Sequence, residues 1–135
     1  MLESLLRPRR SVHAHCDLPC GVYDPAQARI EAESVKACQQ KYQDSDDEIF
    51  RARAISIKED RANLVKEHLW VLWTDYFKPE HLQKYPELHE HFWTATKLAG
   101  EAKHSVDPKK GQQLLKAIEK IDKIFWETKK AKKAA

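Results

Sequence analysis

The chain has 135 residues, of which 41% are hydrophobic, 33% are charged and only three are glycine, a composition typical of a single domain of amphipathic helices. The net charge of +3 resides at the two ends, because residues 15–128 carry 17 basic against 20 acidic residues, and this negative body excludes a nucleic-acid-binding surface. No apolar run approaches the ~20 residues of a transmembrane helix, which excludes a membrane protein.

The first fourteen residues, MLESLLRPRRSVHA, are predicted to be a removable leader. Pro8 and the arginines around it disfavour folding, and the small residues Val12 and Ala14 precede His15 as a processing protease would require. The apolar stretch is too short for a secretory signal, and no hydrophobic segment follows the paired arginines. We therefore expect a cytoplasmic protein with a leader over residues 1–14 and a functional domain over residues 15–135.

The densest group of metal-ligand side chains lies in the stretch HAHCDLPCGVYDP, residues 13–25. If cleavage makes His15 the first residue, its amine, the amide nitrogen and thiol of Cys16 and the thiol of Cys20 can form a plane of two nitrogens and two sulfurs. The imidazole of His15 is then left for an axial position. Such donors suit nickel(II) or copper(II), whereas zinc prefers a tetrahedron without amide nitrogen, and thiolates would reduce copper(II).

Spacing alone leaves two other interpretations of this stretch open, a zinc site from His13, His15, Cys16 and Cys20 or a reversible dithiol. The odd number of three cysteines excludes the disulfide framework of a small secreted protein. The third, Cys38, is predicted to be a small core residue of a helix.

Two pairs of residues predict helix starts. Asp24-Pro25 and Asp107-Pro108 each place a capping side chain directly before a proline at the first helical position. We expect the first of these helices to end near residue 43 and the second to continue toward the C-terminus, where its lysine-rich end is predicted to be solvated and frayed.

Two further helices are predicted between them. A capping box from Ser45 to Glu48 is predicted to open a long helix that ends near Phe77, and another helix is expected from about Pro86 until Gly100 stops it. Alternating strand patterns are absent, so the sequence predicts an all-α, up-down-up-down four-helix bundle preceded by a metal-binding hook. The residues predicted to face inward are Glu31, Ser34, Val35, Cys38, Tyr42, Ile49, Phe50, Ile57, Leu64, Val65, Leu69, Leu72, Trp73, Tyr76, Leu88, Phe92, Ala95, Leu98 or Ala99, Leu114, Leu115, Ile118, Ile121, Ile124 and Phe125.

Some polar and aromatic residues on these faces need a separate explanation. Arg61 and Glu31 fall on inward stripes, where they can pair with each other or extend to the rim of the bundle. Four histidines are predicted to be surface or packing residues, and the spacing of His89 and His91 on a helix does not let these two chelate one ion together; the four are His68, His81, His89 and His91. The tryptophans are predicted to be core or subunit contacts.

The segment HCDLPCGVY, His15–Tyr23, closely resembles the nickel-binding hook of the nickel superoxide dismutases, and we call it the hook. The likeness continues through DPAQARIEAESVKA, VLWTDYFKPEH, KYPELH and IDKIFWETKKA, and so covers essentially the whole chain from His15 onward. The resemblance implies a leader-processing protease, a four-helix subunit and a hollow homohexamer with one nickel ion per subunit, bound only after leader removal.

The resemblance also implies the nickel ligands by matching position. His15 would supply its amine and an axial imidazole, Cys16 its amide nitrogen and thiolate, and Cys20 the second thiolate. Before cleavage the backbone nitrogen of His15 is part of the peptide bond to Ala14 and is not a free amine. We therefore expect the hook to be unformed or metal-free in the precursor.

Residues around the ligands are implied in the same way. Glu31 matches a glutamate that holds the imidazole, and Arg61 matches an arginine that contacts this glutamate. Tyr23 and Tyr76 match tyrosines near the open nickel face, and Asp17 matches a residue that lines the approach through its backbone. Among these residues, Tyr23 joins the two ligand cysteines as an implied catalytic residue.

The implied activity is the disproportionation of superoxide. Nickel(III) would take an electron and release dioxygen, and nickel(II) would return it to a second superoxide with two protons, giving hydrogen peroxide. Tyr23, a bound water or a protonated thiol could deliver the protons. Two other classes stay open from the residues, a metal carrier with an exchangeable hook and a helical interaction module with an incidental cysteine pair.

Overall fold

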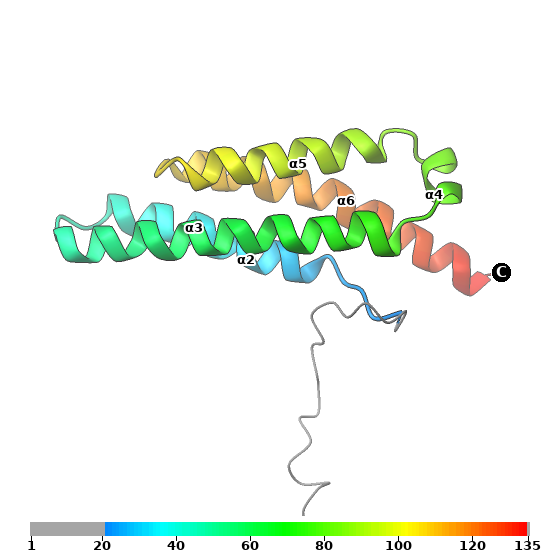
Figure 1. Cartoon of the computed structure of the whole chain (residues 1–135), viewed down its shortest axis with the longest axis horizontal. Coiled ribbons are helices and arrows are strands. Elements are labelled where there is room, and N and C mark those ends of the chain that lie inside the picture. Colours follow the sequence, from blue (N-terminus) through cyan, green and yellow to red (C-terminus); the bar gives the residue numbers. More distant parts are fainter. Residues whose placement is uncertain (1–20, 135) are drawn as a thin grey trace, which may run out of the picture.

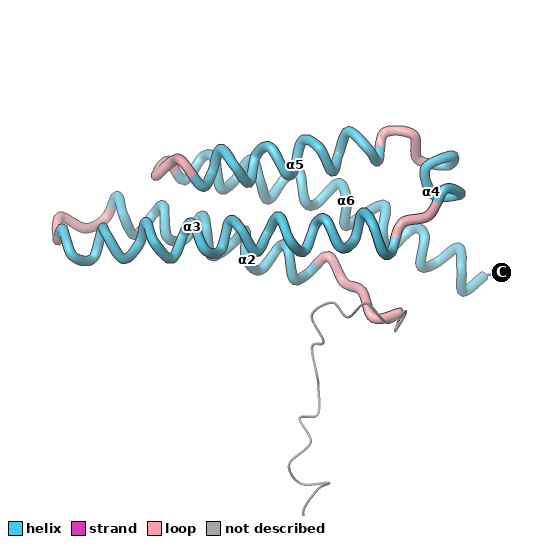
Figure 2. The backbone as a smooth tube through the Cα atoms, viewed as in Figure 1, coloured by secondary structure: helices cyan, strands magenta, loops and turns pink. Residues whose placement is uncertain are grey.

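The computed structural model describes residues 21–134, and the regular elements within this range are all helices. Four long helices form the bundle, each antiparallel to the next along the chain (Figure 1): α2 (Ala26–Gln43), α3 (Glu48–Val71), α5 (Leu88–Lys103) and α6 (Pro108–Ala134). A π-helix, η1 (Leu72–Tyr76), continues α3, and a short helix, α4 (Pro79–Lys84), joins it to α5 (Figure 2). The predicted up-down-up-down bundle is confirmed.

Neighbouring helices follow the chain around the bundle. α2 packs against α3 and α6, while α5 packs against the same two helices from the other side, so that α2 and α5 lie on a diagonal. The start of α2, η1, α4 and the last turns of α6 all lie at one end of the bundle (Figure 1). We call this the hook end, because the chain enters α2 there from the hook. None of the described helices is long and apolar enough to cross a membrane.

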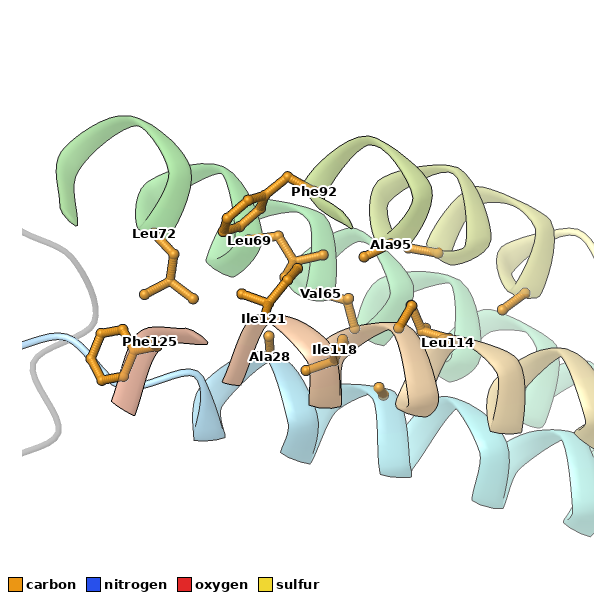
Figure 3. Close-up of a cluster of buried hydrophobic side chains, with 14 of the residues drawn as sticks. Ala28, Val65, Leu69, Leu72, Phe92, Ala95, Leu114, Ile118, Ile121 and Phe125 are labelled. Atoms are coloured by element: carbon orange, nitrogen blue, oxygen red, sulfur yellow. The ribbon is translucent and has the colours of Figure 1, made fainter. Parts of the chain in front are cut away.

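Large aliphatic and aromatic side chains fill the space between the helices. Leu69 and Leu72 of α3 and η1 meet Phe92 of α5 and Ile121 and Phe125 of α6 (Figure 3). Each is at most 4% exposed, and burying one side chain of this size contributes ~1.5–3 kcal/mol. Small residues, Ala28 and Ala32 on α2 and Ala95 and Ala99 on α5, complete this core and let the helix backbones approach closely.

Both helix starts predicted from Asp-Pro pairs are present, at Pro108 for α6 as predicted and one residue later than predicted, at Ala26, for α2. The Oδ1 atom of Asp24 accepts from Ala26 N at 2.9 Å, and the Oδ1 atom of Asp107 accepts from Lys109 N at 2.9 Å. Each carboxylate thereby satisfies a backbone donor that has no partner within its helix.

The predicted capping box from Ser45 to Glu48 is wrong. Asp47 is the capping residue of α3, because its Oδ1 atom accepts from Ile49 N at 3.0 Å and Phe50 N at 3.4 Å. Ser45 instead accepts from Asp47 N at 3.2 Å and so supports the cap. Asp is as good an N-cap as Ser, and the chain uses the carboxylate that lies directly before the helix.

The predicted limits of α5 also need correction. The helix begins at Leu88 rather than Pro86, and it passes Gly100 to end at Lys103. A glycine inside a helix costs ~1 kcal/mol, and the burial of Ala99 and Ala102 on either side outweighs that cost. Helix α4 is an addition to the predicted elements, because its six residues between Pro79 and Pro86 are too few to show a helical pattern in the sequence.

Parts of the predicted inward faces are exposed or only half-buried. On α2 the fully buried positions are Ala28, Ala32, Val35 and Gln39, while the predicted Glu31, Ser34, Cys38 and Tyr42 lie half-buried along one flank. On α3, Ile49 is 75% exposed, Phe50 39% and Ile57 43%. The first turns of α3 extend past the end of α5 in Figure 1, so α5 does not cover them.

Buried polar side chains secure the turn between α5 and α6, at the end of the bundle opposite the hook end. Gln39 of α2 donates to Ala102 O and Ser105 O, both at 3.1 Å, and accepts from Gly111 N at 3.1 Å. Lys58 of α3 donates from Nζ to Lys103 O at 2.6 Å and to Ser105 O at 2.8 Å. These bonds satisfy backbone carbonyl and N–H groups near the ends of α5 and α6 that lack partners within their helices.

Candidate metal centre

The predicted ligands His15, Cys16 and Cys20, together with Asp17, lie outside the described residues. The described chain begins at Gly21, whose φ of 70° lies in the left-handed region that favours glycine. Within residues 21–134, no group of three or more His, Cys, Asp or Glu side chains could hold a metal ion.

A pocket of about 640 Å³ opens at the hook end, where the chain enters the bundle. The predicted site residues Tyr23 and Tyr76 both line it, and their ring centroids lie 5.6 Å apart. The structure therefore brings these two tyrosines together beside Gly21. We call this cavity the tyrosine pocket; its other lining residues include His81, Thr128 and Lys129.

Tyr76 is held from several sides. It is the last residue of the π-helix η1, a type of irregular turn often found at functional sites. Its ring lies 4.4 Å from that of Phe125 and stacks on His81 at 5.8 Å, measured between centroids. Its hydroxyl lies 2.7 Å from the Oγ1 atom of Thr128. The ring is therefore fixed by contacts from α4 and α6.

The charge of the tyrosine pocket suits an anion. Four lysines line it against two carboxylates, and the Nζ atom of Lys129 lies 5.1 Å from the ring centroid of Tyr76. The sequence predicted a solvated, frayed end for α6, but the helix continues to Ala134 and brings two of these lysines to the pocket. The charged lining residues are Asp75, Lys78, Glu80, Lys84, Lys129 and Lys132.

His81 enters the pocket from α4. Its Nδ1 atom accepts a hydrogen bond from Lys78 N at 3.0 Å, so the neutral ring carries its proton on Nε2. Burial lowers the pKa of His81, the nearby Glu80 charge opposes this effect, and the Lys78 charge adds to it. The predicted role as a surface or packing residue overlooked the pocket, because α4 was not predicted.

Glu31 and Arg61 form the ion pair that the sequence allowed. The Nη1 atom of Arg61 lies 3.3 Å from Oε1 and 3.2 Å from Oε2 of Glu31, and so links α3 to α2. The Glu31 side chain is 16% exposed and that of Arg61 is 42% exposed, which places the pair at the rim of the bundle rather than in its core. The pair avoids the large desolvation cost of a fully buried pair.

Cys38 is a free, half-buried cysteine on α2. Burial raises the pKa of its thiol, an effect that the charges of Arg61, Lys41 and Lys58 partly oppose. A raised pKa leaves less of the reactive thiolate at neutral pH. The prediction of a small core residue is met only in part, because the side chain is half-buried at the edge of the core.

The comparisons with known proteins agree with one another. Residues 10–129 match the family model of the nickel-containing superoxide dismutases. The chain is 61% identical to "Superoxide dismutase [Ni]" of Streptomyces coelicolor and 62% identical to that of Streptomyces seoulensis. Each alignment spans 131 residues, which are 97% of this chain and 100% of the relative.

Solved structures of nickel superoxide dismutase share the fold. The native structure has a TM-score of 0.85 at 63% identity and covers 86% of this chain and 99% of its own, while an apo structure covers 82% of this chain and 99% of its own. Three related variant structures carry substitutions of a histidine at the first position, an aspartate two positions later and a tyrosine eight positions after the histidine.

Proposed function

Because the chain belongs to the nickel-containing superoxide dismutases, we propose that it disproportionates superoxide by nickel(III)/nickel(II) cycling at the hook, after cleavage before His15. Membership makes the protein an oxidoreductase with a nickel cofactor and superoxide as its substrate. The site, its ligands and the cleavage are the parts that we propose. The observation that supports these parts is that three residues near the start of this chain have the same spacing as three substituted residues in the solved relatives.

The spacing is that of the three positions substituted in the variant structures of the relatives. A histidine, an aspartate two positions later and a tyrosine eight positions after the histidine occur in this chain as His15, Asp17 and Tyr23. In the relatives the histidine is counted as the first residue, whereas fourteen residues precede His15 here. This match supports cleavage between Ala14 and His15, and with it a free amine on His15.

The donors available at the hook fit nickel. The amine of His15, the amide nitrogen of Cys16 and the thiolates of Cys16 and Cys20 are strong nitrogen and sulfur donors that would hold the ion, with the His15 imidazole as a further ligand. Bound there, nickel supplies a one-electron couple that oxidises one superoxide to dioxygen and reduces a second, which with two protons becomes hydrogen peroxide.

Residues of the described bundle would support this chemistry. Glu31 would accept a hydrogen bond from the His15 imidazole, and Arg61 would keep the carboxylate ionised and in place. The excess of lysines in the tyrosine pocket would attract the superoxide anion. Tyr23 and Tyr76 would line its approach, and Asp17 would contribute its backbone.

Exposed apolar side chains support the proposed homohexamer. Trp93 is 60% exposed, Ile30 52% and Trp70 50%, in addition to the exposed residues at the start of α3. Apolar side chains of this size on the surface favour contacts between subunits. Native mass spectrometry of the leader-free, nickel-loaded chain should give six times the subunit mass, and a monomer at micromolar concentration would refute the hexamer.

Three forms of the chain test the function. The first keeps the leader, the second starts at His15, and the third starts at His15 and carries both Cys16→Ser and Cys20→Ser. After nickel loading, only the unsubstituted chain that starts at His15 should dismute superoxide. Equal activity with the leader attached would contradict the proposed cleavage. Loss of nickel on dialysis against a chelator would favour the metal carrier, and unchanged function of the double variant would favour the interaction module.

A further inference from the structure

Thr128 of α6 makes two short hydrogen bonds at the tyrosine pocket. Its Oγ1 atom lies 2.6 Å from Phe125 O and 2.7 Å from the hydroxyl oxygen of Tyr76, and the residue is only 6% exposed. A carbonyl oxygen has no proton, so Thr128 must donate to Phe125 O. A threonine hydroxyl carries one proton, and that proton is thereby used.

The other bond must therefore receive its proton from Tyr76. We infer that Thr128 is a positioning residue, which directs the phenolic proton of Tyr76 toward α6 and leaves the lone pairs of the phenol oxygen as an acceptor in the tyrosine pocket. The inference rests on the proposed function in placing this pocket beside the reacting ion. The direction of the proton itself follows from the two distances.

The surroundings of Tyr76 leave rotation of the hydroxyl about its C–O bond as the remaining freedom. His81 stacks on the ring with an interplanar angle of 13°, and Phe125 and Tyr23 contact it at 4.4 Å and 5.6 Å between centroids. Because the ring cannot turn readily between these neighbours, the acceptor at Thr128 decides where the proton points. Thr128 thus fixes the direction of the O–H bond of Tyr76.

This arrangement has a consequence for the reaction. An oxygen that presents lone pairs repels an anion such as superoxide and accepts a hydrogen bond from a neutral donor such as water or hydrogen peroxide. In this state Tyr76 favours binding of the protonated product over the anionic substrate. Donation from Tyr76 to superoxide would require the Thr128 hydroxyl to take up another role.

The direction of the proton can be measured without nickel. Ultraviolet resonance Raman spectra of the full chain, each subtracted from the spectrum of its Tyr76→Phe counterpart, isolate the Fermi doublet of Tyr76, whose intensity ratio distinguishes a donating from an accepting phenol. We expect a donor signature in the unsubstituted chain and in Thr128→Ser, and its loss in Thr128→Val. The matched control is Thr74→Val, which removes another helical threonine bond, from Thr74 to Trp70 O at 2.8 Å.

An acceptor signature in the unsubstituted chain would overturn the inference, as would an unchanged doublet in folded Thr128→Val. If Thr128→Val does not fold, the spectra of the unsubstituted chain and of Thr128→Ser still decide the question. The Raman result also stands if the nickel-loaded chain has no dismutase activity, so that failure of the inference and failure of the proposed function are distinguishable.

A second measurement uses azide as an anionic probe of the nickel-loaded, leader-free enzyme. In Thr128→Val the phenolic proton is free to point into the pocket, and one hydrogen bond to an anion should tighten azide inhibition by about tenfold. Thr128→Ser should restore the original inhibition constant, which a purely structural role of the methyl group would not do. Equal inhibition constants in all three proteins would contradict the inference.

Discussion

Arg61 of α3 holds the carboxylate of Glu31 on α2 at 3.2 Å, at the rim of the bundle. If Glu31 receives the His15 imidazole, Glu31→Gln should lower nickel affinity or dismutase activity by about 10- to 100-fold, the usual effect of losing a partner that orients a metal ligand. Nickel retention during dialysis and superoxide decay measure the two quantities.

The matched control for this change is Glu33→Gln. Glu33 lies on the same helix and pairs with Arg29 at 2.8 Å, but both side chains are about half exposed, at 53% and 49%. An exposed pair of this kind is worth little, so nickel retention should not change. If Glu31→Gln and Glu33→Gln retain nickel equally well, Glu31 does not hold the imidazole.

The lysines of the tyrosine pocket should accelerate the reaction by attracting superoxide. Lys129→Met removes the charge that lies 5.1 Å from the centroid of the Tyr76 ring, and we expect a several-fold lower kcat/KM at low ionic strength and a weaker dependence on salt. Pulse radiolysis at several salt concentrations measures both. Lys116→Met, an exposed substitution elsewhere on α6, is the control, and an identical salt dependence in both variants would contradict steering by the pocket.

His81 should make the stability of the fold depend on pH. Because burial lowers its pKa in the folded state, the unfolded chain binds more protons between that lowered pKa and the ordinary value of about 6.5. The contribution of the buried, neutral His81 side chain to the free energy of unfolding is fully present above about pH 6.5 and is lost as the pH falls below this value.

The change that tests this contribution is His81→Asn, which keeps an acceptor for Lys78 N but does not titrate. Urea unfolding of this variant between pH 7.5 and about 5 should show a smaller loss of unfolding free energy than the unsubstituted chain. His104→Asn, at an exposed position after α5, is expected to keep the original slope. If the unfolding free energies of His81→Asn and of the unsubstituted chain fall equally steeply with pH, the titration of His81 does not cause the pH dependence.

Lys58 should stabilise the bundle at the end opposite the hook end. Its side chain is 3% exposed, and its ammonium group binds two carbonyl oxygens at and after the negative end of the α5 dipole. Lys58→Met keeps the apolar stem but leaves these oxygens without the ammonium donor, so we expect a loss of ~2–3 kcal/mol in the free energy of unfolding.

Chemical denaturation measures this loss, and the exposed substitution Lys116→Met should change stability by less than about 0.5 kcal/mol. The specific activity of folded Lys58→Met should stay unchanged, because the residue lies far from the tyrosine pocket. A stability equal to that of Lys116→Met would mean that the two short hydrogen bonds contribute nothing net.

The parts of this structure that sequence could predict depend on local chemistry. Asp24 and Asp107 mark helix starts because a carboxylate beside a proline acts within a few residues of itself. The inward stripe of α6, including Leu114, Ile121 and Phe125, is confirmed because a single face of that helix is apolar.

The remaining features depend on residues far apart in the sequence. Ile49 and Ile57 have the spacing of core residues, but periodicity does not reveal which neighbour covers a face, and these two lie exposed. Thr128 carries no motif, and its importance arises from a tyrosine 52 residues away. For His81 the sequence held one usable signal, since Pro79 stands at the first position of α4 as Pro108 does in α6, although Lys78 lacks the capping carboxylate of an Asp-Pro pair. The density of donor residues marks His15, Cys16 and Cys20 as candidate ligands, the resemblance selects nickel over the alternatives, and these residues precede the described part of the chain.

The free amine of His15 is the central requirement of the proposed site. The most direct test compares the chain that starts at His15 with the same chain carrying one added glycine before it, both loaded with nickel and studied by electron paramagnetic resonance. We expect the low-spin nickel(III) signal and superoxide dismutation only when His15 is the first residue. The same signal and equal activity in the glycine-extended chain would contradict the account.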